Sequence, residues 1–398
     1  MRSNESRHYF CGMQIIEVNN ESLAKSFLLF YPALYKNDPN FIRPLDKDIN
    51  EVFDEKKNKA FRFGTTRRWL LQNEQGEYIG RIAAFVHKKY RNKGDKFKVG
   101  GFGFFDVIND QEAANTLLDT AKAWLEEQGM QAMDGPINFG ERDKWWGLLI
   151  EGFDPPLYGM NYNAPYYQQL LEHYGCEVFF YQNCYSRPVH GRLSEKFYTA
   201  HEKLSQSGEF EARRADKNDL EKYARDFCTV YNDAWAQHEG NKSMAPEQAI
   251  QLFKTMKPIM DPDLVWFAYK NGAPVACYIS LPNLNQAFKY LDGQFNLWAK
   301  LKFVYHRWRG SIKSFTGIVF GIVPSCQGSG VDYFMVVEAA KILQPAGKYE
   351  TTELQWMGDF NPKMNNIAKH LDFKLSRRLA TYRYQFDRDL PFARHPIF

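Results

Sequence analysis

The feature that most constrains the fold is an internal repeat. Residues 68–86 and 264–281 each place a short polar turn with a glycine between two apolar runs, a pattern that predicts a β-hairpin. Each hairpin is followed, after an insertion, by an apolar strand and a helix, within residues 103–128 and 316–343. Elements that recur in the same order about 200 residues apart predict two copies of one α/β unit, not a short-period solenoid.

The repeat extends to the end of each copy. Residues 163–175 and 361–373 both start with an asparagine close to a proline, continue as a short helix, and precede a strand that carries aromatic residues. The chain is therefore expected to contain two domains, residues 13–190 and 209–390. The linker between them, within residues 189–214, is expected to hold one helix.

Composition and length exclude several classes of protein. The chain has 398 residues, 44% of them hydrophobic and 25% charged, which is the composition of a soluble globular protein. No run approaches the ~18 apolar residues of a membrane helix, so no membrane insertion is expected. Six cysteines without Cys-x-x-Cys spacing and no export signal indicate no metal site and reduced thiols in a cytoplasm. Residues 1–12 carry no apolar signal core and are expected to be dispensable.

Two segments concentrate positive charge, although the net charge of +4 is mild. Residues 87–98 are expected to form a solvated loop between strands. Residues 297–309 mix basic and apolar residues at helical spacing, which predicts that the apolar side chains face the core. The apolar set is Leu297, Leu301, Val304, Tyr305 and Trp308. The basic side chains that remain available for a polyanionic ligand are Lys300, Lys302, Arg307 and Arg309.

A glycine-bearing turn joins an apolar strand to an apolar helix within residues 317–343. Gly328 and Gly330 lie in this turn, where glycine permits positive φ and lets several backbone N–H groups point at one anion. The partial positive charge of the following helix start favours the same anion. The turn therefore predicts a phosphate site that needs no lysine. No zinc-protease, serine-hydrolase or Gly-Lys-Ser/Thr motif competes with this interpretation.

Residues 209–386 resemble the GNAT superfamily of acyl-CoA-dependent acyltransferases. The resemblance covers an opening strand, two helices, the hairpin, the central strand with its glycine turn, a helix, a further strand, and the helix that follows Asn361. The turn of that family has the pattern Gln or Arg, two residues, Gly, one residue, then Gly or Ala. Gln327 and Gly330 match this pattern, and Asp332 occupies its last position. The first half resembles the same fold more faintly and lacks the glycine turn.

The resemblance implies an α/β (α+β) fold of two tandem GNAT-like domains, each with a central mixed, mostly antiparallel sheet flanked by helices. It also implies that the second domain binds acetyl-CoA or another acyl-CoA. The pantetheine arm would pair with the backbone of Ile322 and Val323, and Asn361 would lie near the cofactor. The N–H groups that would hold the pyrophosphate are those of Gln327, Gly328, Ser329, Gly330 and Val331.

Two positions depart from the family pattern. Asp332 is unfavourable beside a pyrophosphate because of its charge, and an alternative role for it is to cap the helix start. The family often has a tyrosine that protonates the departing thiolate where this chain has Ala368, and Tyr333 or a cysteine is the substitute considered. For the general base, Asp359 is preferred over Glu353 because it follows its strand at the expected mouth of the cleft.

The first copy carries a long insertion, residues 134–162, which is rich in glycine, proline and tryptophan. Long loops with a biased composition are often binding elements. The alternative is that Trp145 and Trp146 seal the contact between the two halves. The sequence leaves both interpretations open.

Three functions are compatible with the sequence. The first is an acyl-CoA-dependent, acetyltransferase-like N-acyltransferase that acts on a small-molecule or peptide amine, with the first half shaping the acceptor cleft. The second is an aminoacyl-tRNA-dependent Fem-type aminoacyltransferase, in which residues 298–309 would contact RNA phosphates. The third is a noncatalytic module that binds CoA or another ligand. No nucleic-acid partner is expected outside the second hypothesis.

Overall fold

The computed structural model of the chain describes residues 9–10, 12–235 and 243–397. Most of the segment predicted to be dispensable, residues 1–12, lies outside the described residues. The first half contains β1 (Tyr9–Phe10), β2 (Met13–Glu17), α1 (Glu21–Leu34), α2 (Asp46–Val52), η1 (Lys59–Arg62), β3 (Gly64–Gln72), β4 (Tyr78–His87), β5 (Val99–Val107), α3 (Gln111–Glu127), β6 (Ala132–Gly135), β7 (Leu148–Glu151), α4 (Tyr166–Tyr174) and β8 (Glu177–Pro188). The linker helix α5 (Glu195–Ser207) leads into β9 (Phe210–Arg214), α6 (Leu220–Trp235), α7 (Pro246–Met256), η2 (Pro262–Leu264), β10 (Val265–Lys270), β11 (Ala273–Pro282), α8 (Asn285–Phe288), α9 (Leu297–Trp308), β12 (Ser314–Ile322), η3 (Pro324–Cys326), α10 (Val331–Ala346), β13 (Thr351–Gly358), α11 (Pro362–His370) and β14 (Lys374–Gln385).

The strands form one sheet that runs through both halves of the molecule. Its order is β1-β2-β3-β4-β5-β6-β14-β8-β13-β12-β11-β10-β9, and β7 pairs with β14 beside this path. The pairs β5–β6 and β12–β13 are parallel, whereas the other strand pairs of the described chain are antiparallel. The mixed, mostly antiparallel α/β fold expected from the sequence is confirmed. The repeat did not indicate that the two halves share a single sheet.

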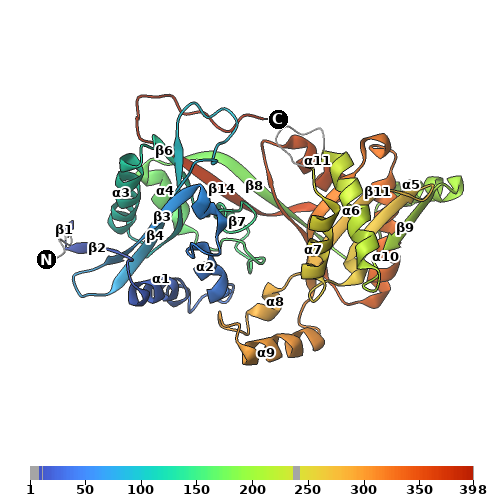
Figure 1. Cartoon of the computed structure of the whole chain (residues 1–398), viewed down its shortest axis with the longest axis horizontal. Helices are drawn as coiled ribbons and strands as arrows, with labels where there is room; N and C mark the ends of the chain where they lie inside the picture. Colours follow the sequence, from blue (N-terminus) through green and yellow to red (C-terminus); the bar gives the residue numbers. More distant parts are fainter. Residues whose placement is uncertain (1–8, 11, 236–242, 398) are drawn as a thin grey trace.

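The two halves exchange their last strands. β8 ends the first half, yet it pairs with β13 of the second half, where residues 182–188 lie opposite residues 351–358. β14 ends the second half and pairs with β6 of the first half, where residues 382–385 lie opposite residues 132–135. β8 and β14 also pair with each other, and Figure 1 shows them side by side across the middle of the molecule. Each half therefore completes its sheet with a strand from the other.

Local signals in the sequence explain where several helices begin and end. The side chains of Asn20, Asp110 and Asn296 each accept a hydrogen bond from the N–H three residues later, at the starts of α1, α3 and α9. These bonds satisfy amide groups that a helix start otherwise leaves without a partner. At their other ends, α4 and α5 stop at Gly175 and Gly208, which adopt the left-handed conformation that glycine tolerates.

Apolar side chains pack against both faces of the sheet in each half. In the first half, α3 contributes Leu117 to the core on one face, and α1 contributes Phe27 on the other. In the second half, α10 contributes Met335 on one face, and α7 contributes Phe253 on the other. Both halves are therefore layered, with helices on the two sides of the sheet, and Figure 1 shows the two groups of helices at opposite ends of the molecule.

The expectation that the apolar residues of α9 face the core is wrong. Leu297, Trp298 and Trp308 expose 72%, 75% and 81% of their surface. Ala299 is buried, and Phe303 packs partly against α8 and its neighbours. Helical periodicity shows that apolar residues share one face of a helix, but it does not show whether other parts of the protein cover that face.

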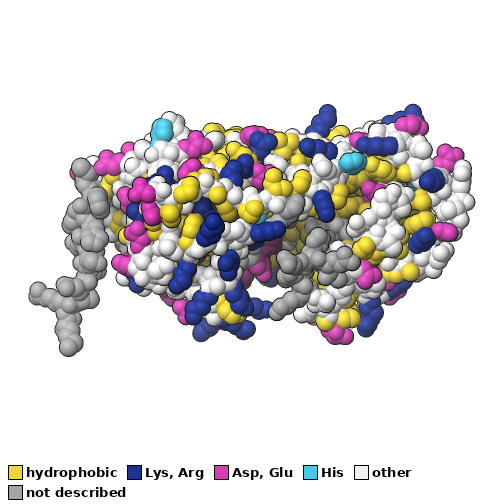
Figure 2. Space-filling model, turned by 90° about the horizontal axis from the view of Figure 1, so that it is seen from above, with side chains coloured by type: hydrophobic (Ala, Val, Ile, Leu, Met, Phe, Trp, Pro, Cys, Tyr) yellow, Lys and Arg dark blue, Asp and Glu magenta, His cyan; other side chains and the backbone are white. Residues whose placement is uncertain are grey.

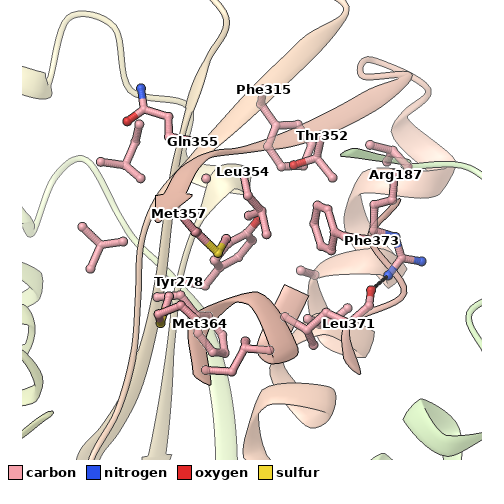
Figure 3. A pocket seen from close by; sticks show the side chains of 18 of the residues that line it. Arg187, Tyr278, Phe315, Thr352, Leu354, Gln355, Met357, Met364, Leu371 and Phe373 are labelled. Atoms are coloured by element: carbon pink, nitrogen blue, oxygen red, sulfur yellow. Dashed lines mark hydrogen bonds between the residues drawn. The ribbon is translucent and has the colours of Figure 1, made fainter. Parts of the chain in front are cut away.

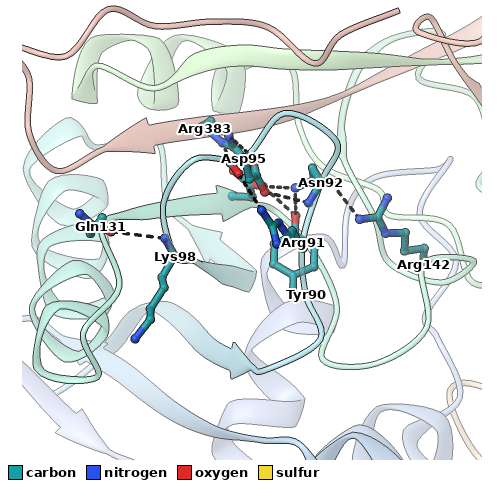
Figure 4. Close-up of polar contacts among 9 residues, drawn as sticks. Tyr90, Arg91, Asn92, Asp95, Lys98, Gln131, Arg142 and Arg383 are labelled. Atoms are coloured by element: carbon teal, nitrogen blue, oxygen red, sulfur yellow. Dashed lines mark hydrogen bonds and ion pairs between the residues drawn. The ribbon is translucent and has the colours of Figure 1, made fainter. Parts of the chain in front are cut away.

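The basic loop at residues 87–98 is solvated, as expected, but two buried polar residues anchor it (Figure 4). Asn92 donates a hydrogen bond to Asp134 at 3.1 Å, and Asp95 accepts one from Arg383 of β14 at 2.8 Å. The loop is thus fixed to the exchanged strand. Charged side chains of both signs are interspersed over the face of the molecule shown in Figure 2.

Candidate active site

Two parallel strands separate in the second half and open the sheet. β12 and β13 pair only from Ser314–Thr351 to Gly317–Leu354. Beyond this point β12 stays paired with β11, with a register shift that leaves Ile318 as the extra residue of a β-bulge. β13 stays paired with β8 on its other side. The facing edges of β12 and β13 therefore present backbone groups to the space between them.

An apolar cavity of about 420 Å³ lies in this opening (Figure 3). Its volume falls within the ~300–1,000 Å³ typical of small-molecule sites. The walls come from β8, β11, β12, β13, α10 and α11. Most of the lining side chains are aliphatic, aromatic or thioether groups, for example Val336, Ala340, Leu343, Leu354, Met357 and Met364. Such a lining favours a hydrocarbon group over a charged one.

A tyrosine supplies a polar group on the wall of this cavity. Tyr278 of β11 lies beside the point where β12 and β13 separate, because a Cβ atom at Gly317 would be 3.5 Å from the Tyr278 hydroxyl. Burial raises the pKa of Tyr278, and the hydroxyls of Ser280 and Thr352 offset part of this increase. The Tyr278 hydroxyl is therefore protonated at neutral pH and is able to donate a hydrogen bond.

Two further hydroxyl groups lie close to the Tyr278 phenol. Ser280 and Thr352 are buried, and their hydroxyls interact with the Tyr278 hydroxyl but with no other group of the described chain. Thr352 lines the cavity, whereas Ser280 does not, so that only the Thr352 hydroxyl is available to a polar group of a ligand there.

The first half of the chain also contributes to the cavity. Arg142 and Asp143, from the insertion at residues 134–162, are among its lining residues. Trp145 and Trp146, from the same insertion, are instead buried in an apolar cluster of the first half. The insertion thus has two roles, because its charged residues reach the cavity while its tryptophans stabilise the core.

The glycine-bearing turn follows β12 and is open to solvent. Gly328 and Gly330 have φ values of +74° and +87°, the left-handed conformation for which glycine was expected. Gln327, Gly328 and Ser329 are exposed, and Gly330 is the N-cap of α10. The structure thus brings Gln327, Gly328, Ser329, Gly330 and Val331 together at a helix start, which is an arrangement that binds phosphate groups.

Asp332 lies in the first turn of α10. Burial raises the pKa of its carboxyl group, and hydrogen bonds from the N–H groups of Asp332 and Tyr333 lower it in part. The N-cap of α10 is Gly330 and no side chain caps this helix start, so Asp332 does not take the N-cap role considered from the sequence. The net effect is a raised pKa, which makes the neutral form of the carboxyl group more accessible beside an anionic ligand than it is for an exposed aspartate.

The position where the family often has a tyrosine holds a fully buried alanine. Ala368 of α11 packs in an apolar cluster. Tyr333 belongs to the same cluster and packs against Phe197, with ring centroids 4.7 Å apart. Tyr333 is not among the residues that line the cavity, whereas Tyr278 is. Tyr278 is therefore better placed than Tyr333 to act on a ligand in the cavity.

Ile322 and Val323 end β12 next to the glycine turn. Ile322 pairs with β11, and the N–H of Val323 donates to Val275 O at 2.9 Å. Asn361 follows β13 and caps α11 by accepting a hydrogen bond from the N–H of Met364 at 3.3 Å. Because β12 and β13 are parallel, their carboxyl ends lie at the same edge of the sheet. The turn and Asn361 therefore lie at the same edge. Ile322, Val323 and Asn361 are not among the residues that line the cavity.

The two residues considered as general base both make structural contacts. Asp359 accepts hydrogen bonds from the N–H of Tyr181 at 3.1 Å and from Arg394 at 2.5 Å. Glu353 binds Arg377 through both carboxylate oxygens, at 2.5 and 3.0 Å. Neither Asp359 nor Glu353 is among the cavity-lining residues. A role for Asp359 in proton transfer stays a prediction. Its hydrogen bond with Tyr181 links the end of β13 to β8.

Sequence reasoning missed two polar residues of this region. The first is Tyr278, which shares a face of β11 with Ser280 by the alternation of a strand, and this alternation was the available signal. The second is Asn365, which is buried, accepts a hydrogen bond from the hydroxyl of Tyr185 at 2.8 Å, and donates one to Gly358 O at 2.9 Å. Asn365 thereby joins α11 to β8 and β13 at one side of the opening.

Two further features are absent from residues 9–10, 12–235 and 243–397. These residues hold no group of three or more His, Cys, Asp or Glu side chains that fits a metal ion. None of their helices is long and apolar enough to cross a membrane. Burial raises the pKa of the Cys277 thiol to about 12, so that this cysteine is a weak proton donor to a thiolate.

Comparisons with known proteins find relatives of similar length at low identity. No family model matches the chain. Protein YghO of Escherichia coli is 25% identical over 376 residues, which cover 92% of this chain and 94% of that protein. The bacterial ceramide synthase of Caulobacter vibrioides is 25% identical over 369 residues, which cover 90% of this chain and 94% of that protein.

Solved structures with a similar fold include GCN5-related N-acetyltransferases. A tandem GNAT protein from the clavulanic acid biosynthesis pathway matches with a TM-score of 0.52 and 9% identity, over 95% of this chain and 100% of that chain. A glucosamine N-acetyltransferase region of a fungal multi-domain β-N-acetylglucosaminidase matches with a TM-score of 0.50 and 12% identity, over 94% of this chain and 38% of that chain. Together with the separated parallel strands and the glycine turn, these matches show that the chain has the fold of the GNAT superfamily.

Proposed function

We propose that the protein is an acyl-CoA-dependent N-acyltransferase. The observation that carries the proposal is the apolar cavity in the opening between β12 and β13, close to an exposed glycine turn at a helix start. The turn suits a diphosphate, the free strand edge suits the amide groups of a pantetheine arm, and the cavity suits hydrocarbon. The cofactor residues predicted from the sequence keep their roles in this proposal: Ile322, Val323, Gln327, Gly328, Ser329, Gly330, Val331 and Asn361.

The acyl group in this proposal is longer than acetyl. A cavity of about 420 Å³ with an apolar lining gains little from a two-carbon group, because hydrophobic stabilisation grows with the apolar area removed from water. Each buried CH₂ of a longer chain contributes roughly 0.8 kcal/mol. The size and chemistry of the cavity therefore favour donors with an extended hydrocarbon chain.

The acceptor in this proposal is the amino group of a lipid-like molecule, such as a long-chain amino alcohol. A ceramide is the amide of such an amine, and one relative that aligns with 90% of this chain is a bacterial ceramide synthase. Arg142 and Asp143 of the first half line the cavity and place charged groups where an amine and its neighbouring hydroxyls would approach. In this proposal the first half helps to form the acceptor site, which is the role that the sequence analysis expects for it.

The reaction follows from these positions. The amine nitrogen attacks the thioester carbonyl, a C–N bond forms, the C–S bond breaks, and the proton lost by the amine is transferred to the departing thiolate. Positioning of the two substrates between β12 and β13 lowers the barrier by proximity. The protonated hydroxyl of Tyr278 donates a hydrogen bond to the oxygen that becomes negative in the transition state. Its raised pKa suits a hydrogen-bond donor and not a base.

The test is an assay with purified full-length protein, a long-chain acyl-CoA and a long-chain amino alcohol. Release of CoA thiol and formation of the amide, followed by a thiol reagent and by mass spectrometry, are expected to be faster with the long-chain donor than with acetyl-CoA. Ala340→Phe, which fills part of the cavity, is expected to reduce use of the long-chain donor by roughly tenfold or more while acetyl-CoA use changes little.

Other outcomes distinguish the alternatives. Stabilisation by acyl-CoA without amide formation from any of a panel of lipid and peptide amines supports the noncatalytic module. Transfer from an aminoacyl-tRNA, with binding that weakens steeply as salt increases, supports the Fem-type reaction. Equal use of both donors by the wild type and by Ala340→Phe contradicts the assignment of the cavity to the acyl chain.

A further inference from the structure

Helix α9 presents an unusual surface for a folded protein. Six of its large apolar side chains are exposed, and they make up a large share of such residues in the described chain: Leu297, Trp298, Leu301, Val304, Tyr305 and Trp308. In Figure 1, α8 and α9 lie at the lower edge of the molecule, away from the sheet. Clustered exposure of this kind marks an interaction surface, because it is costly in water.

The opposite face of α9 fixes the helix to the protein. Ala299 is buried, and Phe303 packs with Phe288 of α8 at a centroid distance of 5.4 Å. His306 stacks on Tyr290 with ring centroids 3.7 Å apart. The N-terminus is capped by Asn296. The exposed side chains therefore belong to a helix held on its inner side, and not to a frayed segment.

Basic residues border the exposed apolar face on both sides. With 3.6 residues per turn, Leu297, Leu301, Val304 and Trp308 share one face, with Trp298 and Tyr305 beside them. On the same wheel, Lys300 and Arg307 lie along one border of this face, and Lys302 and Arg309 lie along the other. Residues 297–309 contain no aspartate or glutamate.

The acidic residue that precedes this helix in the chain does not cancel its charge. Asp292, which precedes α9 in the chain, lies 3.1 Å from the guanidinium of Arg43 in an exposed ion pair. The side chains of Lys300 and Lys302 are exposed. The surface thus combines a broad apolar stripe that ends in tryptophans with basic side chains along its borders.

We propose that α9 docks the protein on the surface of an anionic lipid bilayer. A helix with this arrangement lies in the plane of the interface, where its apolar face is buried at the boundary between headgroups and acyl chains and its basic residues meet anionic headgroups. Tryptophan and tyrosine favour that boundary because one end of each ring is apolar and the other polar. The proposal concerns where the protein resides and does not depend on the acyl-transfer reaction.

The test is flotation of the full-length protein with phosphatidylcholine vesicles that contain or lack phosphatidylglycerol. The wild type is expected to float with the anionic vesicles and to dissociate as salt increases. Trp298→Ala combined with Trp308→Ala is expected to reduce binding by roughly tenfold or more. Lys300→Gln and Lys302→Gln are each expected to reduce it by about fivefold, and only on anionic vesicles.

Matched controls lie on α7, where Leu252 and Lys254 are also exposed. Leu252→Ala and Lys254→Gln are expected to float like the wild type. A second readout is quenching of tryptophan fluorescence by brominated lipids, which the variant with Trp298→Phe and Trp308→Phe is expected to lose while it still floats.

Three results would overturn the proposal: wild-type protein that stays free of anionic vesicles, equal flotation of the α9 and α7 variants, or light scattering that shows a dimer that Leu301→Glu dissociates. The last result would assign the surface to a second copy of the chain. Stabilisation by acyl-CoA measured on the same samples reports on the proposed function separately, so that either proposal is able to fail without the other.

Discussion

In each half of the molecule two parallel strands pair over only a few residues, but the space beyond this pairing is largely filled by the chain in the first half and forms the large cavity in the second. In the first half, the chain after β6 enters the space beside β5, and the N–H of Ile137 donates to Phe102 O at 2.7 Å. A Cβ atom at Gly103 would lie 1.8 Å from the carbonyl oxygen of Ile137. In the second half, the equivalent space beyond Gly317 and Leu354 holds the cavity of about 420 Å³.

The helices that follow the two openings, α3 and α10, also differ at their N-termini. α3 starts with Asp110, whose carboxylate accepts a hydrogen bond from the N–H of Ala113 at 2.7 Å. α10 starts with Gly330, which has no side chain to fill that position. A carboxylate at a helix start occupies the place where a phosphate would bind. The shared fold thus provides the opening in both halves, whereas the loops decide whether the chain fills it or leaves a cavity.

The first prediction has the largest expected effect. It tests whether the stability of the first half depends on β14, which comes from the second half. Arg383 of β14 forms ion pairs with Asp134 at 2.6 Å and with Asp95 at 2.8 Å, and these side chains are almost fully buried. Arg383→Ala leaves two buried carboxylates without their cationic partner and is expected to cost about 3–5 kcal/mol. Urea unfolding measures the loss of stability, and hydrogen exchange in β5 and β6 shows how much of this loss occurs in the first half.

The control for that experiment lies on the same strand. Arg378 pairs with Glu151 at 2.6 Å, but both side chains are partly exposed. Arg378→Ala is expected to cost less than about 1 kcal/mol. A similar loss in both variants would mean that burial of the exchanged strand does not decide the stability of the first half.

The next effect concerns the anion site of the second half. Ser329→Glu places a carboxylate in the glycine turn and is expected to remove the thermal stabilisation by CoA, which for the wild type amounts to about 2.7 kcal/mol at a hundredfold excess of CoA over its Kd. The glutamine in Ser329→Gln has a similar size to glutamate but no charge, and this variant is expected to keep most of the stabilisation by CoA. Asp110→Ser in the first half is expected to leave CoA binding unchanged. CoA binding that improves in Asp110→Ser would show that the first half also binds the nucleotide.

A smaller effect is expected at the cavity. Tyr278→Phe removes the hydroxyl group but keeps the ring, and it is expected to reduce kcat by roughly 10–100-fold with little change in the stabilisation by acyl-CoA. Tyr167→Phe, a buried tyrosine of the first half, is the matched control and is expected to keep kcat. An unchanged kcat in Tyr278→Phe would remove this hydroxyl from the mechanism.

The smallest effect is a pH dependence with opposite signs in the two halves. Burial tends to raise the pKa of Asp261 in the second half, but hydrogen bonds from Lys348 and Tyr349 lower it below 3.8. Its contribution to stability is therefore present above pH 3.8 and is lost as the pH falls through the lowered value. Burial raises the pKa of Asp106 in the first half above 3.8, against the effect of Arg81. Its contribution therefore decreases as the pH rises from 3.8 through the raised value.

The measurement is the free energy of unfolding between about pH 3 and pH 6. Asp261→Asn is expected to flatten the loss of stability on the acid side, because the unfolded state no longer gains a proton that the folded state excludes. Asp106→Asn is expected to make the increase of stability with pH steeper. Slopes that change in the same direction in both variants would contradict the opposite shifts of the two pKa values.

The sequence allowed the local elements to be predicted, because their signals are local. The hairpins at residues 68–86 and 264–281 appear as β3–β4 and β10–β11, and the glycine turn leads into α10 as expected. The exchange of β8 and β14 was not predicted, because alternation of apolar residues identifies a strand but not its partner. The repeat in fact favoured two separate units.

Only the part of the candidate site whose signal is local in the sequence was predicted. The turn from Gln327 to Val331 is a contiguous motif, so that its residues were found together. Tyr278 lies on a neighbouring strand and has no motif of its own, and the cavity depends on how α10 and α11 pack on the sheet. Asp359 follows β13 as expected, but its contacts with Tyr181 and Arg394 depend on segments distant in the chain.

The exchanged strands have a consequence for a chain that is cut in its linker. After cleavage near residues 190–194, the piece that carries β8 would still be hydrogen-bonded to β13 of the other piece, and β14 would still lie between β6 and β8. The two fragments would remain interlocked as one particle, and neither would retain a complete sheet after separation.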